Sequence, residues 1–269
     1  MSPARQLDQF YTNPVVAKHC YQTLVDLVAP AADTYFIEPS AGTGSFFDLL
    51  PIQSRLGLDI DPKHPEVITQ DFFDYKAPAD KERIIVVGNP PFGINTSLAS
   101  RFFNHAASFA ETIAFIVPIS FRKDSMIKRL NPYFELIYDE TLTPDAFVFN
   151  GAPYSVPCCF QIWRRAQTPR IAVAGPLSHP DFNFVKRTIG TFAFKRVGRL
   201  AGKVITDFTD YATTSHFFIK ASDGRKDEEV IAVLEAIDWS QLKWNTAGVA
   251  SISKREMVAA YTKAVESRS

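Results

Sequence analysis

Residues 1–165 alternate between short apolar segments and helical segments, and this alternation limits the fold more than any other feature of the chain. Strands that are separated by helices imply βαβ units, in which a largely parallel sheet carries helices on both faces. The predicted strands are residues 34–40, 54–61, 66–75, 83–92, 111–121, 134–142 and 156–165. Helices are predicted over 15–28 and 97–110. The sequence therefore predicts a complete doubly wound α/β domain with a seven-stranded sheet.

The pattern changes after Gln167-Thr168-Pro169. Short predicted strands at 170–175, 191–200, 201–208 and 214–222 are followed by predicted helices at 228–237 and 254–265. Strands followed by helices indicate an α+β arrangement. We therefore predict two domains, the first over residues 1–167 and a small α+β region over residues 168–269.

Cysteine and hydropathy patterns indicate the compartment. Cys20, Cys158 and Cys159 do not form a disulfide framework, and the adjacent pair is expected to fill a core strand rather than to act in redox chemistry. The first residues lack the apolar stretch of a signal peptide, and no apolar run approaches the ~20 residues of a membrane span. The five histidines are scattered. We therefore expect a cytoplasmic protein with no membrane contact and no metal site.

Charge is distributed unevenly along a chain whose net charge is zero. Residues 160–226 hold 12 Lys and Arg but only four Asp and Glu, whereas the flanking segments are acidic. A basic block within a neutral chain is what contact with a polyanion requires, although a solvated strand face has the same composition.

The most informative motif is Asn89-Pro90-Pro91-Phe92, which follows a predicted buried strand. Open α/β sheets bind ligands outside the carboxyl ends of their strands. Two prolines stiffen the backbone there, so the Asn89 side chain and the Pro90 carbonyl can form a paired acceptor for one amino group. Phe92 adds a flat apolar face. Taken alone, however, the tetrapeptide is also typical of a simple turn.

Four further motifs accompany this tetrapeptide in a fixed order. Phe10 to Pro14 precedes the first helix, and Glu38-Pro39-Ser40-Ala41-Gly42-Thr43-Gly44 follows the first strand. Asp59 ends the second strand, where a carboxylate can accept hydrogen bonds from ribose hydroxyls. Asp71 and Phe72 lie at the end of the third predicted strand, where they could hold an adenine ring. Each motif has an ordinary structural explanation, and the combination is what indicates a nucleoside-binding site.

This combination resembles the class I S-adenosylmethionine-dependent methyltransferases, and among them the N6-adenine methyltransferases of nucleic acid. The resemblance covers residues 10–165 and implies a Rossmann-like sheet with S-adenosylmethionine as cofactor. It implies that the methionine part of the cofactor is held by Tyr11, Thr12, Asn13, Pro14, Glu38, Pro39, Ser40, Ala41, Gly42 and Gly44. It assigns the ribose to Asp59, with Ile60 beside it, and the cofactor adenine to Asp71 and Phe72. The family often has Pro directly after Thr, whereas here Asn13 stands between Thr12 and Pro14.

The resemblance assigns catalysis to Asn89, Pro90, Pro91 and Phe92. Asn89 and the Pro90 carbonyl would accept the two N–H bonds of the target amine and direct its lone pair at the methyl group. An adenine in a duplex would have to be flipped into this pocket and stacked on aromatic rings. Phe92 is one predicted stacking residue, and Phe149 is the second, with Phe147 and Tyr154 as rivals.

The second region is the predicted target-recognition part, because no other segment is long enough. Aromatic and basic residues alternate in it, which is typical of a nucleic-acid surface and equally of a half-buried strand. The predicted contacts are Lys186, Arg187, Lys195, Arg196, Arg199 and Lys203. We expect DNA rather than RNA as the partner. Two alternatives stay open: a protein methyltransferase acting on glutamine amides, and a non-catalytic subunit that binds cofactor and needs a protein partner.

Overall fold

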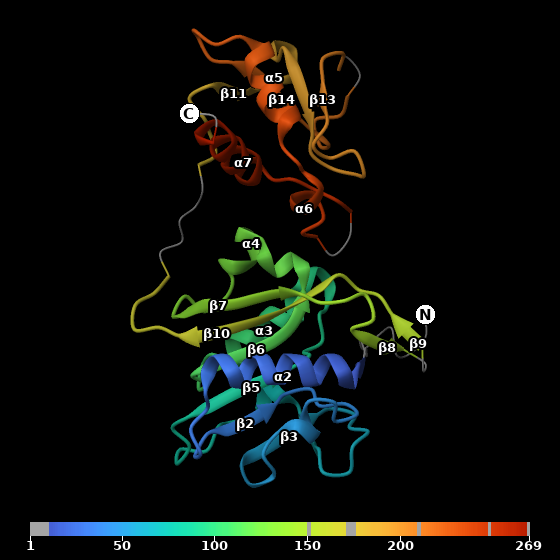
Figure 1. Ribbon diagram of the computed structural model, residues 1–269, viewed down its shortest axis with the longest axis vertical. Helices are drawn as coiled ribbons and strands as arrows, with labels where there is room; N and C mark the ends of the chain where they lie inside the picture. Colours follow the sequence, from blue (N-terminus) through green and yellow to red (C-terminus); the bar gives the residue numbers. More distant parts are fainter. Residues whose placement is uncertain (1–10, 150–151, 171–175, 209–210, 247–248, 268–269) are drawn as a thin grey trace. The chain divides into compact units, whose positions relative to one another are not determined.

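The computed structural model describes residues 11–149, 152–170, 176–208, 211–246 and 249–267 of the chain. The chain divides into two units, Met1–Ile171 and Ala172–Ser269, and each is described by itself (Figure 1). Among the described residues, none of the helices combines the length and the apolar character that crossing a bilayer would need.

A seven-stranded sheet forms the centre of the first unit, in the order β4-β3-β2-β5-β6-β10-β7. Its strands are β2 (Tyr35–Glu38), β3 (Arg55–Asp59), β4 (Ile68–Thr69), β5 (Ile84–Gly88), β6 (Thr112–Pro118), β7 (Phe134–Thr141) and β10 (Cys158–Arg165). The strands from β4 to β6 are parallel, and β10 runs antiparallel to both β6 and β7. The predicted seven-stranded, doubly wound Rossmann-like sheet is confirmed.

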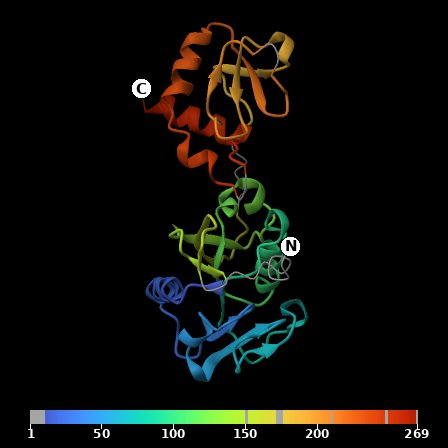
Figure 2. The same ribbon diagram turned by 90° about the vertical axis from the view of Figure 1, so that its right-hand side faces the viewer.

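Helices cover both faces of this sheet. Helix α2 (Pro14–Val28) begins where the Asn13 side chain accepts a hydrogen bond from the backbone N–H of Val15, with Pro14 at the first helical position. It packs on Ile85 and Val87 of β5, whereas helix α3 (Ser97–Ala106) packs on the alternate residues Ile84 and Val86. Figure 2 shows α2 in blue and α3 in teal on opposite sides of the sheet. The sheet is therefore buried on both faces, as its continuous apolar strands require.

The adjacent cysteines of β10 follow the same alternation. Cys158 packs into the α2 face and Cys159 into the α3 face, and both are buried. Burial raises the pKa of Cys158 to about 12 and also raises the pKa of Cys159. Both thiols therefore stay protonated at neutral pH and fill space in the core.

One local prediction was wrong. Residues 66–75 form only the short β4, because the Asp71 carboxylate accepts the Phe73 N–H at 2.9 Å and starts a 3₁₀ helix over Phe72–Asp74. A short 3₁₀ helix also spans Phe47–Leu49. The other short helices of this unit are Ile52–Ser54, Ile94–Thr96, Ile119–Arg122 and α4 (Asp124–Ile127).

A second, smaller sheet joins the N-terminal motif to a later hairpin, which the sequence analysis did not predict. It has the order β1 (Tyr11–Thr12), β8 (Phe147–Phe149) and β9 (Ala152–Tyr154), and both pairs are antiparallel. The backbone N–H of Asn13 also donates to the Ala146 carbonyl at 2.9 Å. The segment before α2 is thus fixed in place by residues more than 130 positions away.

An antiparallel sheet with helices forms the second unit. The sheet has the order β11 (Phe182–Val185), β14 (His216–Ala221), β12 (Phe192–Lys195) and β13 (Val204–Ile205). Its helices are α5 (Asp227–Ala236), α6 (Ser240–Lys243) and α7 (Lys254–Glu266), and a 3₁₀ helix spans Arg187–Ile189. Phe182, Phe192 and Phe194 are buried against α5 and α7. The predicted strand at 170–175 lies almost wholly outside the described residues.

Candidate functional site

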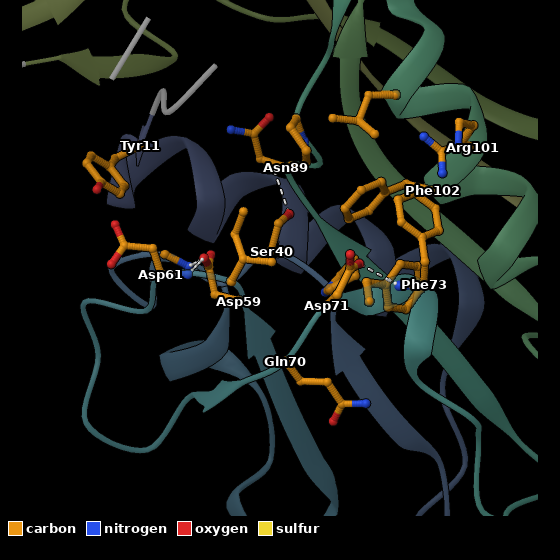
Figure 3. Close-up of a pocket in the computed structure, with 16 residues that line it drawn as sticks. Tyr11, Ser40, Asp59, Asp61, Gln70, Asp71, Phe73, Asn89, Arg101 and Phe102 are labelled. Carbon is orange, nitrogen blue, oxygen red and sulfur yellow. Dashed lines mark hydrogen bonds between the residues drawn. The ribbon is translucent and has the colours of Figure 1, made fainter. Parts of the chain in front are cut away.

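A pocket of about 340 Å³ lies at the carboxyl ends of β2, β3 and β5, where open α/β sheets bind ligands. Its walls come from the motif residues and from α3, and they consist of Tyr11, Pro39, Ser40, Gly42, Asp59, Ile60, Asp61, Gln70, Asp71, Phe72, Phe73, Asn89, Pro91, Leu98, Arg101 and Phe102. Figure 3 shows Tyr11 and Asp61 at one end, Phe73, Arg101 and Phe102 at the other, and Ser40 and Asn89 between them. All five sequence motifs therefore contribute to one cavity.

The Asn89-Pro90-Pro91 corner is tied directly to the glycine loop. The Ser40 hydroxyl donates a hydrogen bond to the Asn89 backbone carbonyl at 2.9 Å (Figure 3). Asn89 is half-buried and borders the pocket together with Pro91, whereas Pro90 is buried. The corner and the loop thus form one wall, and the Asn89 amide lies within a side chain's reach of the rest of the cavity.

The glycine loop and the N-terminal motif support each other. Gly42 has φ +50°, and a Cβ at this position would lie 3.2 Å from the Tyr11 ring. The Ser45 hydroxyl donates to the Thr12 carbonyl at 2.8 Å. Since β1 pairs with β8 on its other side, Tyr11 is held over the loop as a wall of the pocket.

The Asp59 carboxylate organises the floor of the pocket. One of its oxygens accepts the Gly42 N–H and the other accepts the Asp61 N–H, each at 2.8 Å. Every carboxylate oxygen can accept more than one hydrogen bond, so Asp59 can still receive hydroxyl donors from a ligand. Asp61, which the sequence analysis did not select, supplies a second carboxylate at the same end of the cavity.

The end of the pocket that Asp71 borders is built partly by residues outside the sequence motifs. Asp71 borders it, but the Phe72 side chain is only 1% exposed and packs in the core, with its ring centroid 5.2 Å from that of Phe102. Phe73 is more exposed, and the Arg101 guanidinium lies 4.4 Å from its ring centroid. The residues that the sequence analysis missed here follow helical spacing along α3 and are Leu98, Arg101 and Phe102.

Several predicted site residues support the pocket without bordering it. Thr12 and Ala41 are buried, Asn13 and Pro14 begin α2, and Gly44 packs its backbone against the His64 ring. Glu38 is fully buried beneath the loop. Phe92 is 9% exposed and packs edge to face on Phe147, with ring centroids 5.9 Å apart. The backbone of Phe149 ends β8, but its side chain lies outside what the structure describes.

Replacing Gly42 by Ala tests the contact between the glycine loop and Tyr11, which lies over the loop as a lid. A left-handed backbone costs a non-glycine residue about 1–2 kcal/mol, and the new Cβ would also press on the Tyr11 ring. We expect the free energy of unfolding to fall by about 1–2 kcal/mol and the affinity for S-adenosylmethionine, measured by titration calorimetry, to be roughly tenfold weaker. Gly224→Ala is the matched control, because Gly224 has φ +87° with nothing within 4 Å. If both variants bind the ligand like the parent, the lid contact has no role in binding.

The carboxyl group of Glu38 has an unusually high pKa. Burial raises its pKa well above the ordinary value, a hydrogen bond with the Phe47 backbone opposes the rise, and the charges of Asp59 and Asp48 add to it. Its Oε2 atom is buried and has no hydrogen-bond partner among the described residues. We expect Glu38 to keep its proton at pH values at which an exposed glutamate is ionised.

The raised pKa of Glu38 makes stability depend on pH. In the unfolded chain Glu38 loses its proton near pH 4.5, whereas the folded protein retains it, so the free energy of unfolding falls as pH rises above 4.5 toward the folded-state pKa. In Glu38→Gln no group titrates at this position, so this contribution to the pH dependence of the free energy of unfolding is lost. The free energy of unfolding is measured by urea denaturation for the parent and the variant from pH 4.5 to 8. As the pH increases, the variant is expected to become steadily more stable relative to the parent. A difference independent of pH would contradict the assignment.

Four of the six predicted nucleic-acid contacts border two hollows of the second unit. Lys186 and Arg187 line one of about 310 Å³, and Lys195 and Lys203 line another of about 350 Å³. The Arg196 guanidinium lies 5.1 Å from the Phe217 ring centroid, and Arg199 is exposed.

No protein-family model matches the chain, and no curated protein matches its sequence. Several solved structures resemble it. A proposed RNA methyltransferase from Pyrococcus horikoshii is 16% identical with a TM-score of 0.49, covering 61% of this chain and 90% of that one. Magnesium protoporphyrin IX methyltransferase from Synechocystis PCC 6803, solved with SAM, is 15% identical with a TM-score of 0.40, covering 56% and 79%. N-methyltransferase NodS from Bradyrhizobium japonicum WM9 is 12% identical with a TM-score of 0.40, covering 58% and 98%. Similarities this low do not decide function.

Proposed function

We propose that the chain is an S-adenosylmethionine-dependent methyltransferase that methylates the N6 amino group of adenine in DNA. One observation carries the proposal: the Asn89 corner is hydrogen-bonded to the glycine loop, and both border the pocket that Asp59 and Asp71 also line. An amine acceptor and a nucleoside-binding floor therefore face the same 340 Å³ cavity.

The donors and acceptors around the pocket suit this cofactor. Asp59 and Asp61 offer carboxylate oxygens to the two ribose hydroxyls, and Asp71 offers one to an adenine amino group. Ile60 is 59% exposed and, with Phe73 and Phe102, supplies apolar surface for an adenine ring. Tyr11 and the glycine loop border the pocket on the same side as Asp59 and Asp61, and the methionine part would lie between them and Asn89.

In the proposed reaction, S-adenosylmethionine supplies an electrophilic methyl group on a sulfonium sulfur. The exocyclic nitrogen of adenine is a weak nucleophile because its lone pair is delocalised into the ring. Asn89 Oδ1 and the Pro90 carbonyl would accept hydrogen bonds from its two N–H groups, which localises the lone pair and stabilises the positive charge that develops on nitrogen. As the N–C bond forms, the C–S bond would break and S-adenosylhomocysteine would leave. The methylated nitrogen would then lose one proton to solvent. Pro90 and Pro91 would hold these acceptors in place. Positioning of the reacting groups can lower an activation barrier by roughly 7–11 kcal/mol.

Stacking of the flipped base is assigned to Phe92 and Phe149. Because Phe92 is 9% exposed and packed on Phe147, it must expose more of its ring when a base enters. The basic second unit is assigned the DNA backbone, since neutralised phosphates dominate the affinity of such proteins.

Incubation with labelled cofactor and three acceptors tests the proposal: adenine-containing duplex DNA, RNA of the same sequence, and a protein rich in exposed glutamines. We expect N6-methyladenine in DNA. Methyl transfer only to protein would replace this proposal with a glutamine-amide methyltransferase. Cofactor binding without transfer to any acceptor would instead indicate a subunit that lacks its catalytic partner.

A further inference from the structure

The second unit contains a hollow of about 310 Å³ that combines aromatic and basic walls. It lies between β11, β14 and the start of α7, and its lining consists of Phe184, Val185, Lys186, Arg187, Thr213, His216, Phe217, Phe218 and Lys254. Of the three cationic side chains, Lys186 and Arg187 are adjacent in the chain and Lys254 comes from a distant segment, and none of the described lining residues is acidic. The hollow is therefore positively charged as well as apolar.

Two half-buried rings form the apolar wall. Phe184 of β11 and Phe217 of β14 meet edge to face, with ring centroids 5.3 Å apart. Both are less buried than Phe182, Phe192 and Phe194, which are fully enclosed in the core beneath them. The partial exposure of Phe184 and Phe217 leaves flat apolar surface at the edge of the sheet, where a planar ring can pack.

Cationic groups surround these rings. The Lys254 ammonium lies 4.5 Å from the Phe184 ring centroid and 5.8 Å from that of Phe217. Lys186 and Arg187 are exposed at the mouth of the hollow. A ligand that places a planar ring against the aromatic side chains can therefore bring an anionic group to several cations at once.

A buried histidine adds a polar group to the wall. His216 is 3% exposed, and its Nδ1 lies 3.1 Å from the Ala212 carbonyl and 3.0 Å from the Ser215 hydroxyl. Nε2 is buried and has no partner among the described residues. A polar ligand group that reaches Nε2 would remove the cost of leaving this buried nitrogen unsatisfied.

We infer that this hollow binds one unstacked nucleotide of the DNA strand, with its base against Phe184 and Phe217 and its phosphate held by Lys186, Arg187 and Lys254. The combination of planar apolar surface, three cations and a buried imidazole nitrogen matches a nucleotide, whereas a simple anion would leave the rings unused. Single-stranded nucleic acids are bound by this pairing of basic groups with stacking rings. The inference rests on the proposed function, because it takes DNA as the substrate.

Fluorescence anisotropy with a labelled 12-mer of thymidine tests the inference on the full-length protein at several salt concentrations. This probe contains no adenine, so its binding does not depend on methyl transfer. Phe184→Leu keeps the side chain apolar but removes the flat ring, and we expect affinity to fall about fivefold or more with an unchanged salt dependence. Arg187→Ala is expected to weaken binding and to reduce the salt slope by about one.

Two exposed residues outside the hollow provide matched controls. Ile189→Ala removes exposed apolar surface and Lys220→Ala removes an exposed cation of β14, and both variants are expected to bind within twofold of the parent. Thermal melting confirms that each variant folds. The inference is overturned if Phe184→Leu and Ile189→Ala have equal effects, if the parent does not bind the probe, or if it binds a uridine 12-mer tenfold more tightly. Absence of methyladenine with the expected pattern of thymidine binding would instead reject only the proposed reaction.

Discussion

Asn89→Ala is expected to reduce the rate of methyl transfer to DNA by about 10²–10³-fold, while the affinity for S-adenosylmethionine stays within threefold of the parent. Removing one preorganised hydrogen-bonding group from a reaction centre typically has an effect of about this size. The Asn89 backbone carbonyl, which anchors Ser40 at 2.9 Å, is retained in the variant, so the pocket itself should persist. Single-turnover kinetics and titration calorimetry measure the two quantities separately.

Asn89→Asp separates a chemical role from a structural one. A carboxylate oxygen can accept the same N–H as the amide oxygen, so this variant is expected to be much more active than Asn89→Ala. Asn183→Ala removes an exposed amide from β11 in the second unit and serves as the control. A fully active Asn89→Ala enzyme would contradict the assigned role of the corner.

Asp59→Ala is expected to weaken S-adenosylmethionine binding about 100-fold or more. The substitution removes the acceptor of two backbone N–H groups, those of Gly42 and Asp61, which both lie 2.8 Å from the carboxylate. Hydrogen bonds to a charged group contribute about 1.5–3 kcal/mol each, and the variant also loses the proposed contact with the ribose. Calorimetric titration with S-adenosylmethionine measures the change.

Asp74→Ala is the control for this substitution, because Asp74 is an exposed carboxylate of the nearby 3₁₀ helix and does not line the pocket. It is expected to bind the cofactor like the parent. Binding by Asp59→Ala within threefold of the parent would show that the carboxylate organises neither the loop nor the ligand.

The central sheet could be predicted from the sequence because its strands are apolar on both faces. Residues 84–87 face α2 and α3 alternately, so every position is buried and the strand appears as a continuous apolar run. The shared location of the motifs could also be predicted, because parallel strands bring their carboxyl ends to the same edge of the sheet. Asn89, Asp59 and Gly42 therefore border one pocket although they are distant in sequence.

The missed residues depend on which way an element turns in the folded protein, and spacing along the chain does not determine this direction. The segment 97–110 was predicted to be helical, but the sequence alone does not show that its Leu98, Arg101 and Phe102 turn toward the cavity. The Asp71 side chain caps the 3₁₀ helix Phe72–Asp74, and in this helix the Phe72 side chain is buried in the core whereas that of Phe73 is partly exposed. Likewise, Tyr11 pairs with Val148 in two very short strands. The sequences of these segments look like loops, so their pairing could not be predicted.

Methylation of adenine in DNA by a protein that uses the Asn89-Pro90-Pro91 corner is tested most directly on natural nucleic acids. The protein and labelled S-adenosylmethionine are incubated with unmethylated genomic DNA and total RNA in parallel, followed by digestion and nucleoside analysis of each. We expect labelled N6-methyldeoxyadenosine from the DNA, and we expect this product to be lost in Asn89→Ala. A label found only on RNA, on another position of the base, or on neither nucleic acid would contradict the proposed function.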